Sequence, residues 1–253
     1  INVHETGAIE STGHKVITVP NYDGKIKPCD IYKAFKLHTD EHMVKPKMVY
    51  ISQTTEAGTV YTKEELTEIY TVTKGLGMYL FVDGARLASA LATNKMTLND
   101  LAHYSDVFYI GATKNGSPLG EAVCIVNNEL KEFFRYSIKQ NGGMYSKGYV
   151  AGIQFEELFK DGLYFKLGHN SNMMAEKLAN GLVKRNIELE YKPVTNQLFV
   201  RVSNELYSKL QELVLFELWE DKITEKVIRF VTNFSTTEEE IDNFFEELDK
   251  INK

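Results

Sequence analysis

Residues 78–87 (MYLFVDGARL) and residues 106–116 (DVFYIGATKNG) each place a short apolar run directly before a polar segment that contains glycine. Each apolar run has the length of a buried strand. Asp83, Arg86 and Lys114 follow these runs and therefore lie where the strands end. In open α/β sheets, ligands bind outside the carboxyl ends of the strands. The two segments thus predict a parallel sheet with a binding site at one edge.

The flanking sequence extends this pattern toward both sides. Helices are expected over residues 27–41 and from Thr62, where Glu65 completes a capping-box spacing and a glycine pair at 75–77 ends the helix. Further strands are expected at residues 15–19 (KVITV), 47–53 (KMVYISQ) and 122–126 (AVCIV). Strands that alternate with helices of this length imply right-handed crossovers and a largely parallel sheet that is covered on both faces. The predicted class is α/β.

The pattern changes after residue 146. A long amphipathic helix is expected over residues 164–185, and a last acidic helix starts at Thr236 or Thr237. Between them lie short runs that are rich in β-branched or aromatic residues, at 187–191, 197–202, 213–219 and 226–232. Strands clustered between two helices predict a small C-terminal α+β domain. We therefore expect a large domain over residues 1–146 and a small domain over residues 147–253.

Composition restricts the class of function. The 253 residues carry 29 basic and 35 acidic side chains, and a net charge of −6 argues against binding of a nucleic-acid backbone. No apolar run is long enough for a membrane span, and no signal-peptide pattern is present. Cys29 and Cys124 are too few for a disulfide framework and are not spaced as metal ligands. We expect a cytoplasmic protein without a metal site.

Asp83 is the first residue whose position implies chemistry. It follows four apolar residues and precedes Gly84, so a carboxylate there needs a cationic partner. A protonated pyridine nitrogen is one such partner, and it would keep a pyridoxal cofactor in its electron-withdrawing form. An ion pair with Arg86 or a helix N-cap explains the same position about equally well.

The residues around Lys114 indicate a possible role for its amine. A lysine beyond a buried strand and between glycines can reach a pocket in which desolvation lowers the pKa of its amine and favours attack on an aldehyde. Most lysines at strand ends are simply solvated. The combination with Asp83 at the neighbouring strand end is the stronger signal.

Together these segments resemble fold-type-I pyridoxal-phosphate (PLP) enzymes of the low-specificity threonine aldolase family. The resemblance rests on VDGARL (82–87) and GATKNG (111–116), supported in the same order by VHETGA (3–8), ISQTTE (51–56) and Thr195-Asn196. It covers essentially the whole chain. It implies a PLP-dependent transferase-like large domain and PLP as the cofactor.

The resemblance also assigns roles to single residues. Lys114 would bind PLP covalently, Asp83 would contact the pyridine nitrogen, and Arg86, Thr55 and Thr113 would contribute to the cofactor site.

Arg229 is the only charge in the apolar run VIRFVT (227–232), and such a residue is more often a strand-edge arginine. The resemblance instead assigns it to the substrate carboxylate, which a guanidinium binds with two parallel hydrogen bonds. Glu5 would lie at the substrate. The catalytic base stays open among Glu5, Glu56, His4 and a bound water.

The activity that this implies is cleavage of L-threonine or L-allo-threonine to glycine and an aldehyde, by a homodimer or homotetramer with shared active sites. The alternatives are β-elimination on another amino acid and a non-catalytic fragment that acts as a dimerisation or regulatory partner. The chain starts at Ile1, and the family's stacking histidine and phosphate-binding loop precede an opening of this kind. We therefore expect that an upstream segment is missing.

Overall fold

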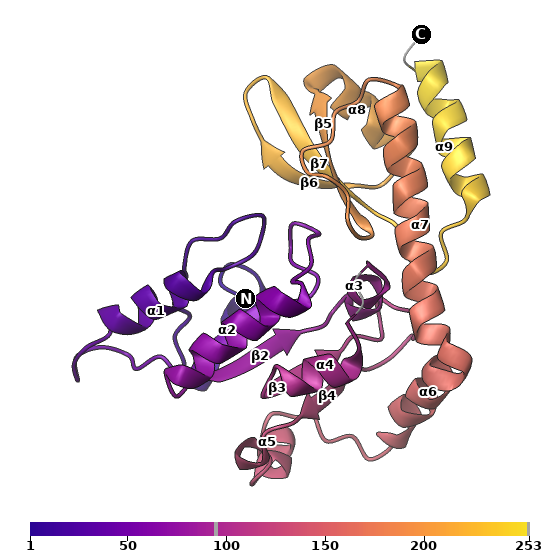
Figure 1. Cartoon of the computed structure of the whole chain (residues 1–253). Coiled ribbons are helices and arrows are strands. Elements are labelled where there is room, and N and C mark those ends of the chain that lie inside the picture. Colours follow the sequence, from indigo (N-terminus) through magenta and orange to yellow (C-terminus); the bar gives the residue numbers. More distant parts are fainter. Residues whose placement is uncertain (94–95, 252–253) are drawn as a thin grey trace.

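The computed structural model describes residues 1–93 and 96–251, and Figure 1 shows a sheet in each half of the chain. The first sheet has the strand order β1-β2-β3-β4, with bounds Met48–Ser52, Tyr79–Asp83, Val107–Ile110 and Ala122–Ile125. β1, β2 and β3 run parallel, whereas β4 runs antiparallel to β3. The predicted α/β class with a largely parallel sheet is confirmed.

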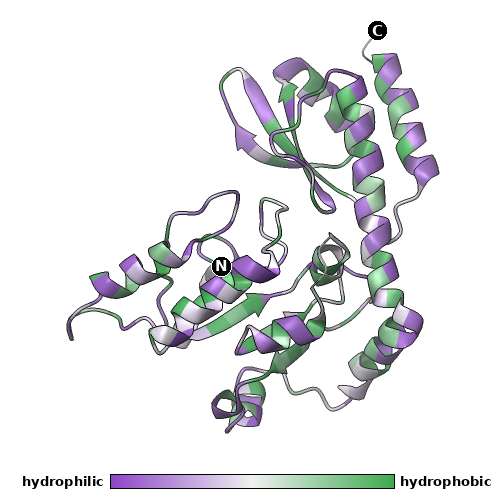
Figure 2. Ribbon diagram, in the orientation of Figure 1, coloured by the Kyte–Doolittle hydropathy of each residue, from purple (hydrophilic) through white to green (hydrophobic). Residues whose placement is uncertain are grey.

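The central strand β2 separates the core from the site. Successive side chains of a strand point to opposite faces. Leu80 and Val82 are buried in the core, whereas Tyr79, Phe81 and Asp83 lie on the other face and stay partly exposed. The apolar character of β2 is visible in Figure 2. Asp83 therefore ends the strand on the face that points away from the main core.

Helix α2 (Lys63–Gly75) packs on this core and begins and ends as the sequence predicts. The Thr62 hydroxyl accepts a hydrogen bond from the Glu65 backbone N–H (3.2 Å), and the Glu65 carboxylate accepts one from the Thr62 N–H (2.8 Å). Such a capping box satisfies two N–H groups that the helix itself leaves without partners. The other helices of this half are α1 (Pro28–Leu37), α3 (Leu87–Thr93), α4 (Leu98–His103), α5 (Phe134–Gln140) and α6 (Tyr149–Phe159). Short 3-10 segments are η1 (Glu5–Gly7), η2 (Glu10–Thr12), η3 (Asn128–Leu130) and η4 (Lys160–Gly162).

The C-terminal half is an antiparallel sheet packed against helices. Its strand order is β5-β7-β6, with bounds Gln197–Ser203, Glu225–Val231 and Glu217–Asp221. The helices are α7 (Leu163–Lys184), α8 (Asn204–Leu213) and α9 (Glu238–Ile251). A second hydrophobic cluster, which includes Met174, Leu198, Ile228 and Leu248, fills the space between them. This confirms the expected long helix, last helix and α+β character.

Helix α7 connects the two halves. Gly168 lets it approach α3 closely, because a Cβ at this position would lie 2.3 Å from the Ala88 carbonyl oxygen. Next to this contact, the Asn172 side chain donates to the Ser89 carbonyl (2.9 Å). Tyr164 at the start of α7 packs in the hydrophobic core of the first sheet, although it lies beyond the expected domain boundary at residue 146. The position of that boundary stays a prediction. None of the described helices combines the length and apolar composition that a membrane span requires.

Three expected strands differ in the structure. Residues 15–19 and 187–191 have strand-like composition but form no named strand, and only Leu189 makes an isolated bridge, to Val200. A short strand is stable only when neighbouring strands accept its hydrogen bonds. The expected strand at 213–219 begins only at Glu217, and its first residue, Leu213, is instead the last residue of α8. The Ser203 hydroxyl caps α8 by accepting from the Leu206 N–H (3.1 Å).

Candidate active site

The loops that follow β1, β2 and β3 are hydrogen-bonded to one another. The Gln53 N–H donates to the Asp83 carbonyl (2.7 Å), and the Gly111 N–H donates to the Gly84 carbonyl (3.0 Å). The predicted convergence of polar residues at these strand ends is therefore present.

Two glycines make this convergence possible. A Cβ at Gly84 would lie 2.0 Å from the Tyr109 carbonyl oxygen, and a Cβ at Gly111 would lie 2.4 Å from the Ala85 carbonyl oxygen. Both obstacles are backbone atoms, which cannot rotate away as a side chain can. The loops that carry Asp83 and Lys114 can approach this closely only because neither glycine has a side chain.

The loop that presents Lys114 is fixed on both sides of the lysine. The Asn115 side-chain amide donates to the Gly111 (2.8 Å) and Ala85 (3.0 Å) carbonyls, and the buried Tyr164 hydroxyl donates to the Gly111 carbonyl (2.9 Å). Lys114 itself is exposed and makes no hydrogen bond or ion pair with the described residues. The desolvated pocket that the sequence suggested for its amine is not formed by the described part of this chain.

Thr113 and Glu121 hold the same loop from a second direction. The Glu121 carboxylate accepts hydrogen bonds from the Ala112 N–H and from the Thr113 hydroxyl (2.6 Å). Thr113 is exposed beside Lys114, and its hydrogen bond orients its hydroxyl toward Glu121. Glu121 was not among the residues predicted from the sequence.

The Asp83 carboxylate is held by neutral donors. It accepts hydrogen bonds from the Tyr50 hydroxyl and from the Ala85 N–H (2.9 Å), and it also interacts with the Tyr109 hydroxyl. It forms no ion pair with Arg86 in the described structure, and α3 starts too late in the chain for Asp83 to cap it. Both alternative explanations of this carboxylate are therefore absent, and a site for an external cation remains.

Two guanidinium groups lie near each other beside these loops. Arg86 is partly buried, and its guanidinium makes no direct hydrogen bond or ion pair with the described residues, although the charges of Glu56, Glu217 and Asp83 act on it from a longer distance. Burial, and next the positive charge of Arg229, lower the pKa of Arg86. A desolvated cation without a partner is costly, so this position favours an anionic or polar ligand.

Arg229 reaches the same region from β7. Its guanidinium donates to the Gln197 side-chain oxygen (3.0 Å), pairs with Glu217 and lies 3.8 Å from Glu56. Its centre lies 5.3 Å from the Trp219 ring centroid, and its buried Nε atom has no partner. The side chain is only 12% exposed. Arg229 therefore points inward, although carboxylates of this chain already contact it.

Thr55 is held beside the same cluster, whereas Glu5 is not. The Thr55 carbonyl accepts from the Gln197 side chain (3.2 Å), and its hydroxyl bonds the Thr59 hydroxyl (2.7 Å). Glu5 lies in η1, is exposed, and its carboxylate has no hydrogen bond or ion pair with the described residues. The structure gives Glu5 no connection to the cluster.

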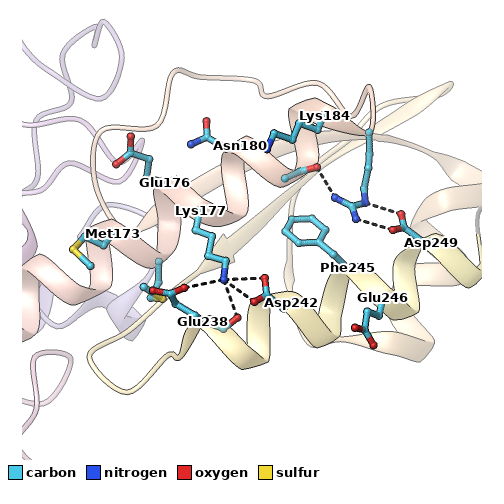
Figure 3. A pocket seen from close by; sticks show the side chains of 13 residues that line it. Met173, Glu176, Lys177, Asn180, Lys184, Glu238, Asp242, Phe245, Glu246 and Asp249 are labelled. Atoms are coloured by element: carbon cyan, nitrogen blue, oxygen red, sulfur yellow. Dashed lines mark hydrogen bonds and ion pairs between the residues drawn. The ribbon is translucent and has the colours of Figure 1, made fainter.

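Two hollows in the surface differ in their relation to this cluster. One is lined by Tyr50, Ser52, Glu56 and Trp219 among others, and therefore adjoins the strand ends. The other lies between α7 and α9, away from the cluster, and is drawn in Figure 3. Two of its cations are already paired: Lys177 contacts Glu238 and Asp242, and Arg185 contacts Asp249. Only the first hollow belongs to the candidate site.

A model of the beta-eliminating lyase family matches residues 1–205. The chain belongs to this family. A low specificity L-threonine aldolase of Pseudomonas sp. (strain NCIMB 10558) is 34% identical over 208 residues, which are 80% of this chain and 60% of that protein. The Escherichia coli (strain K12) protein of the same name is 30% identical over 192 residues, or 74% of this chain and 52% of the relative. The chain thus spans little more than half the length of these curated relatives.

Solved structures agree with this family. The threonine aldolase of Leishmania major superimposes with a TM-score of 0.95 at 48% identity, over 98% of this chain and 74% of that one. A Sphingomonas wittichii serine palmitoyltransferase superimposes with a TM-score of 0.65 at 13% identity, over 90% of this chain and 59% of that one, and shares the fold alone. The fold is that of the fold-type-I PLP enzymes, as predicted.

Family and fold identify PLP as the cofactor, and the residues of the candidate site fit it. An amine without a partner (Lys114), a carboxylate without a cation (Asp83) and a guanidinium without an anion (Arg86) lie on the loops of one sheet edge. These three groups match an aldehyde, a pyridine nitrogen and an oxyanion. No group of three histidine, cysteine, aspartate or glutamate residues in the described ranges is arranged to hold a metal ion.

Proposed function

We propose that this protein cleaves L-threonine and related β-hydroxy-α-amino acids to glycine and an aldehyde. The observation that carries the proposal is the position of Asp83, Arg86 and Lys114 at the strand ends of one sheet, with Arg229 of the second sheet near Arg86. The similarity to a threonine aldolase at 48% identity supports the choice of substrate.

Each residue has one task in this scheme. Lys114 supplies the amine that binds the cofactor aldehyde, and it is accessible for that purpose because it is exposed. Asp83 keeps the proton on the ring nitrogen, and Arg86 binds a polar oxygen of the cofactor. When bound, the cofactor withdraws electrons from the bond between Cα and Cβ.

Arg229 binds the carboxylate of the amino acid. Its planar guanidinium offers two parallel hydrogen bonds, and its buried position keeps water from competing with them. Glu217 must release the guanidinium when a substrate carboxylate binds. Among the candidate bases, Glu56 is the one that contacts the cluster, and we propose that it receives the proton of the β-hydroxyl group.

The test is a spectrum and a product assay on protein reconstituted with PLP. Wild-type protein should show the visible absorbance band of a lysine-bound cofactor and release glycine from L-threonine. Lys114→Ala should lose both, whereas Lys184→Ala, which removes an exposed lysine of α7 away from the candidate site, should keep both. A band that survives Lys114→Ala, or elimination products from aromatic amino acids in place of glycine, contradicts the proposal.

We further propose a cytoplasmic homodimer or homotetramer. Large aromatic side chains of residues 133–149 are exposed, including Phe133 (68%), Tyr136 (74%) and Tyr145 (76%), which suits an interface between protomers. Both cysteines are free, as in a reducing compartment. Light scattering on the purified protein measures the assembly, and a monomeric mass at micromolar concentration contradicts it.

A further inference from the structure

A row of aromatic side chains crosses the first sheet on the face that carries Asp83. Tyr50 of β1 stands in register with Phe81 of β2, and their rings stack with centroids 5.4 Å apart and planes 6° from parallel. Phe81 is next to Tyr109 of β3, with ring centroids 6.4 Å apart. Asp83 follows Phe81 by two residues and therefore shares its face. The two tyrosines thus flank the strand that carries Asp83.

The Tyr50 hydroxyl is hydrogen-bonded to Asp83, and Tyr109 of the neighbouring strand interacts with the same carboxylate. Tyr50 donates to Oδ2, and the Ala85 N–H donates to Oδ1 (2.9 Å). Burial, and next the hydrogen bond to Asp83, raise the pKa of both tyrosines. Both hydroxyls therefore keep their protons at neutral pH and act as donors only toward the carboxylate.

We propose that Tyr50 and Tyr109 are positioning residues that hold the Asp83 carboxylate oriented for the ring nitrogen of the cofactor. Hydrogen bonds to the charged form of a carboxylate favour that form, and neutral donors do so without adding a competing cation. A carboxylate has about four acceptor positions, so the hydrogen bonds from Tyr50 and Ala85 leave room for the protonated ring nitrogen. The proposal rests on the function proposed above, since it assumes that PLP is the ligand.

The first test compares two cofactors in Tyr50→Phe and Tyr109→Phe. Phenylalanine keeps the ring stack with Phe81 and removes only the hydroxyl. One hydrogen bond to a charged group corresponds to roughly tenfold or more in affinity, so PLP should dissociate at least about tenfold more readily from Tyr50→Phe. A deaza analogue of PLP, which lacks the ring nitrogen, should bind wild type and variant alike. A general packing defect would weaken both cofactors equally.

A matched control is available on the same sheet. Tyr79 shares the face of Phe81 and donates to Glu129 (3.1 Å) at the opposite end of β2. Tyr79→Phe removes a tyrosine–carboxylate contact without touching Asp83, and it should leave the affinity for PLP unchanged. In an Asp83→Ala background, Tyr50→Phe should add no further loss, because its effect passes through Asp83.

A second test needs no cofactor. Carbon NMR of the protein without PLP records the chemical shift of the Asp83 carboxyl group, which should change in Tyr50→Phe and stay unchanged in Tyr79→Phe. If PLP binds but neither its affinity nor this chemical shift depends on Tyr50, the inference is wrong while the proposed function stands. If wild-type protein fails to bind PLP, the proposed function fails, and the inference about the cofactor fails with it. The chemical shift then shows whether the tyrosine hydroxyl still contacts Asp83.

Discussion

Glu217→Gln should improve substrate binding, because Glu217 pairs with the guanidinium that is proposed to bind the substrate carboxylate. The Glu217 carboxylate and the substrate carboxylate compete for Arg229. The free energy of the Glu217–Arg229 ion pair is therefore subtracted from the free energy of substrate binding. Glu217 is 52% exposed, and an ion pair exposed to this extent contributes at most about 1 kcal/mol. Its loss should lower KM for L-threonine by up to about fivefold at low salt.

Arg229→Lys should change KM in the opposite direction. An ammonium group cannot form the two parallel hydrogen bonds of a guanidinium, and one lost hydrogen bond to a charged group costs about 1.5–3 kcal/mol. KM should therefore rise by roughly 10- to 100-fold. Opposite shifts from two substitutions of one ion pair are not expected from a general loss of folding.

The assay is steady-state cleavage of L-threonine at several salt concentrations. The matched control is Glu220→Gln, which removes the same charge from β6 at a residue that pairs with Lys222 instead of Arg229. Because salt screens an exposed pair, the difference between wild type and Glu217→Gln should shrink as salt increases. If KM rises or stays constant in Glu217→Gln, or falls equally in Glu220→Gln, the competition does not exist.

Three further predictions concern the stability of the frame around the site. Burial disfavours the charge of Asp106, yet its hydrogen bonds, including one from Lys74 (2.8 Å), hold its pKa below the usual value. A depressed pKa stabilises the fold above the ordinary carboxyl pKa, so Asp106→Asn should cost about 1.5–3 kcal/mol at neutral pH in urea unfolding, and the difference should begin to shrink below about pH 4 and disappear only below the depressed pKa of the folded state. A cost that persists unchanged in acid contradicts this assignment. Gly111→Ala should lower the free energy of unfolding by about 1–3 kcal/mol through its clash with the Ala85 carbonyl, and an unchanged urea midpoint refutes the clash. Tyr164→Phe should remove the buried hydrogen bond to the Gly111 carbonyl and lower Tm by roughly 2–8 °C, whereas an equal Tm by calorimetry means that the bond does not stabilise the loop.

Local patterns predicted the strands that carry the site, but not the direction of β4. An apolar run such as residues 78–82 indicates both the length of a strand and the residue at which it ends. The run at 122–126 is equally clear, yet the direction of a strand depends on the path of its connection. The segment between β3 and β4 contains no helix, which is the feature that permits an antiparallel return.

The residues that surround Asp83 and Arg229 were harder to predict than these two residues themselves. Tyr50 and Tyr109 sit inside apolar runs, where a tyrosine is read as part of the core. Their relation to Asp83 depends on the register of three strands, and a slip by one residue would turn both side chains to the other face. Glu217 belongs to β6, whose five residues are all exposed and carry no apolar pattern. The register of the three strands and the place of Glu217 on β6 both depend on strand pairing, which cannot be predicted from a single segment.

Gln197 shows why the two halves of the chain are best understood as one site. Its amide nitrogen donates to the Thr54 hydroxyl (3.3 Å) and the Thr55 carbonyl (3.2 Å), and its oxygen accepts from Arg229 (3.0 Å). The loop after β1 and the arginine of β7 are therefore bridged by a single buried side chain. Any rotation of one sheet relative to the other must break one of these hydrogen bonds or move Arg229 with the loop. The distance between the proposed carboxylate clamp and the cofactor residues is thus set by packing between the halves, and neither half holds the site alone.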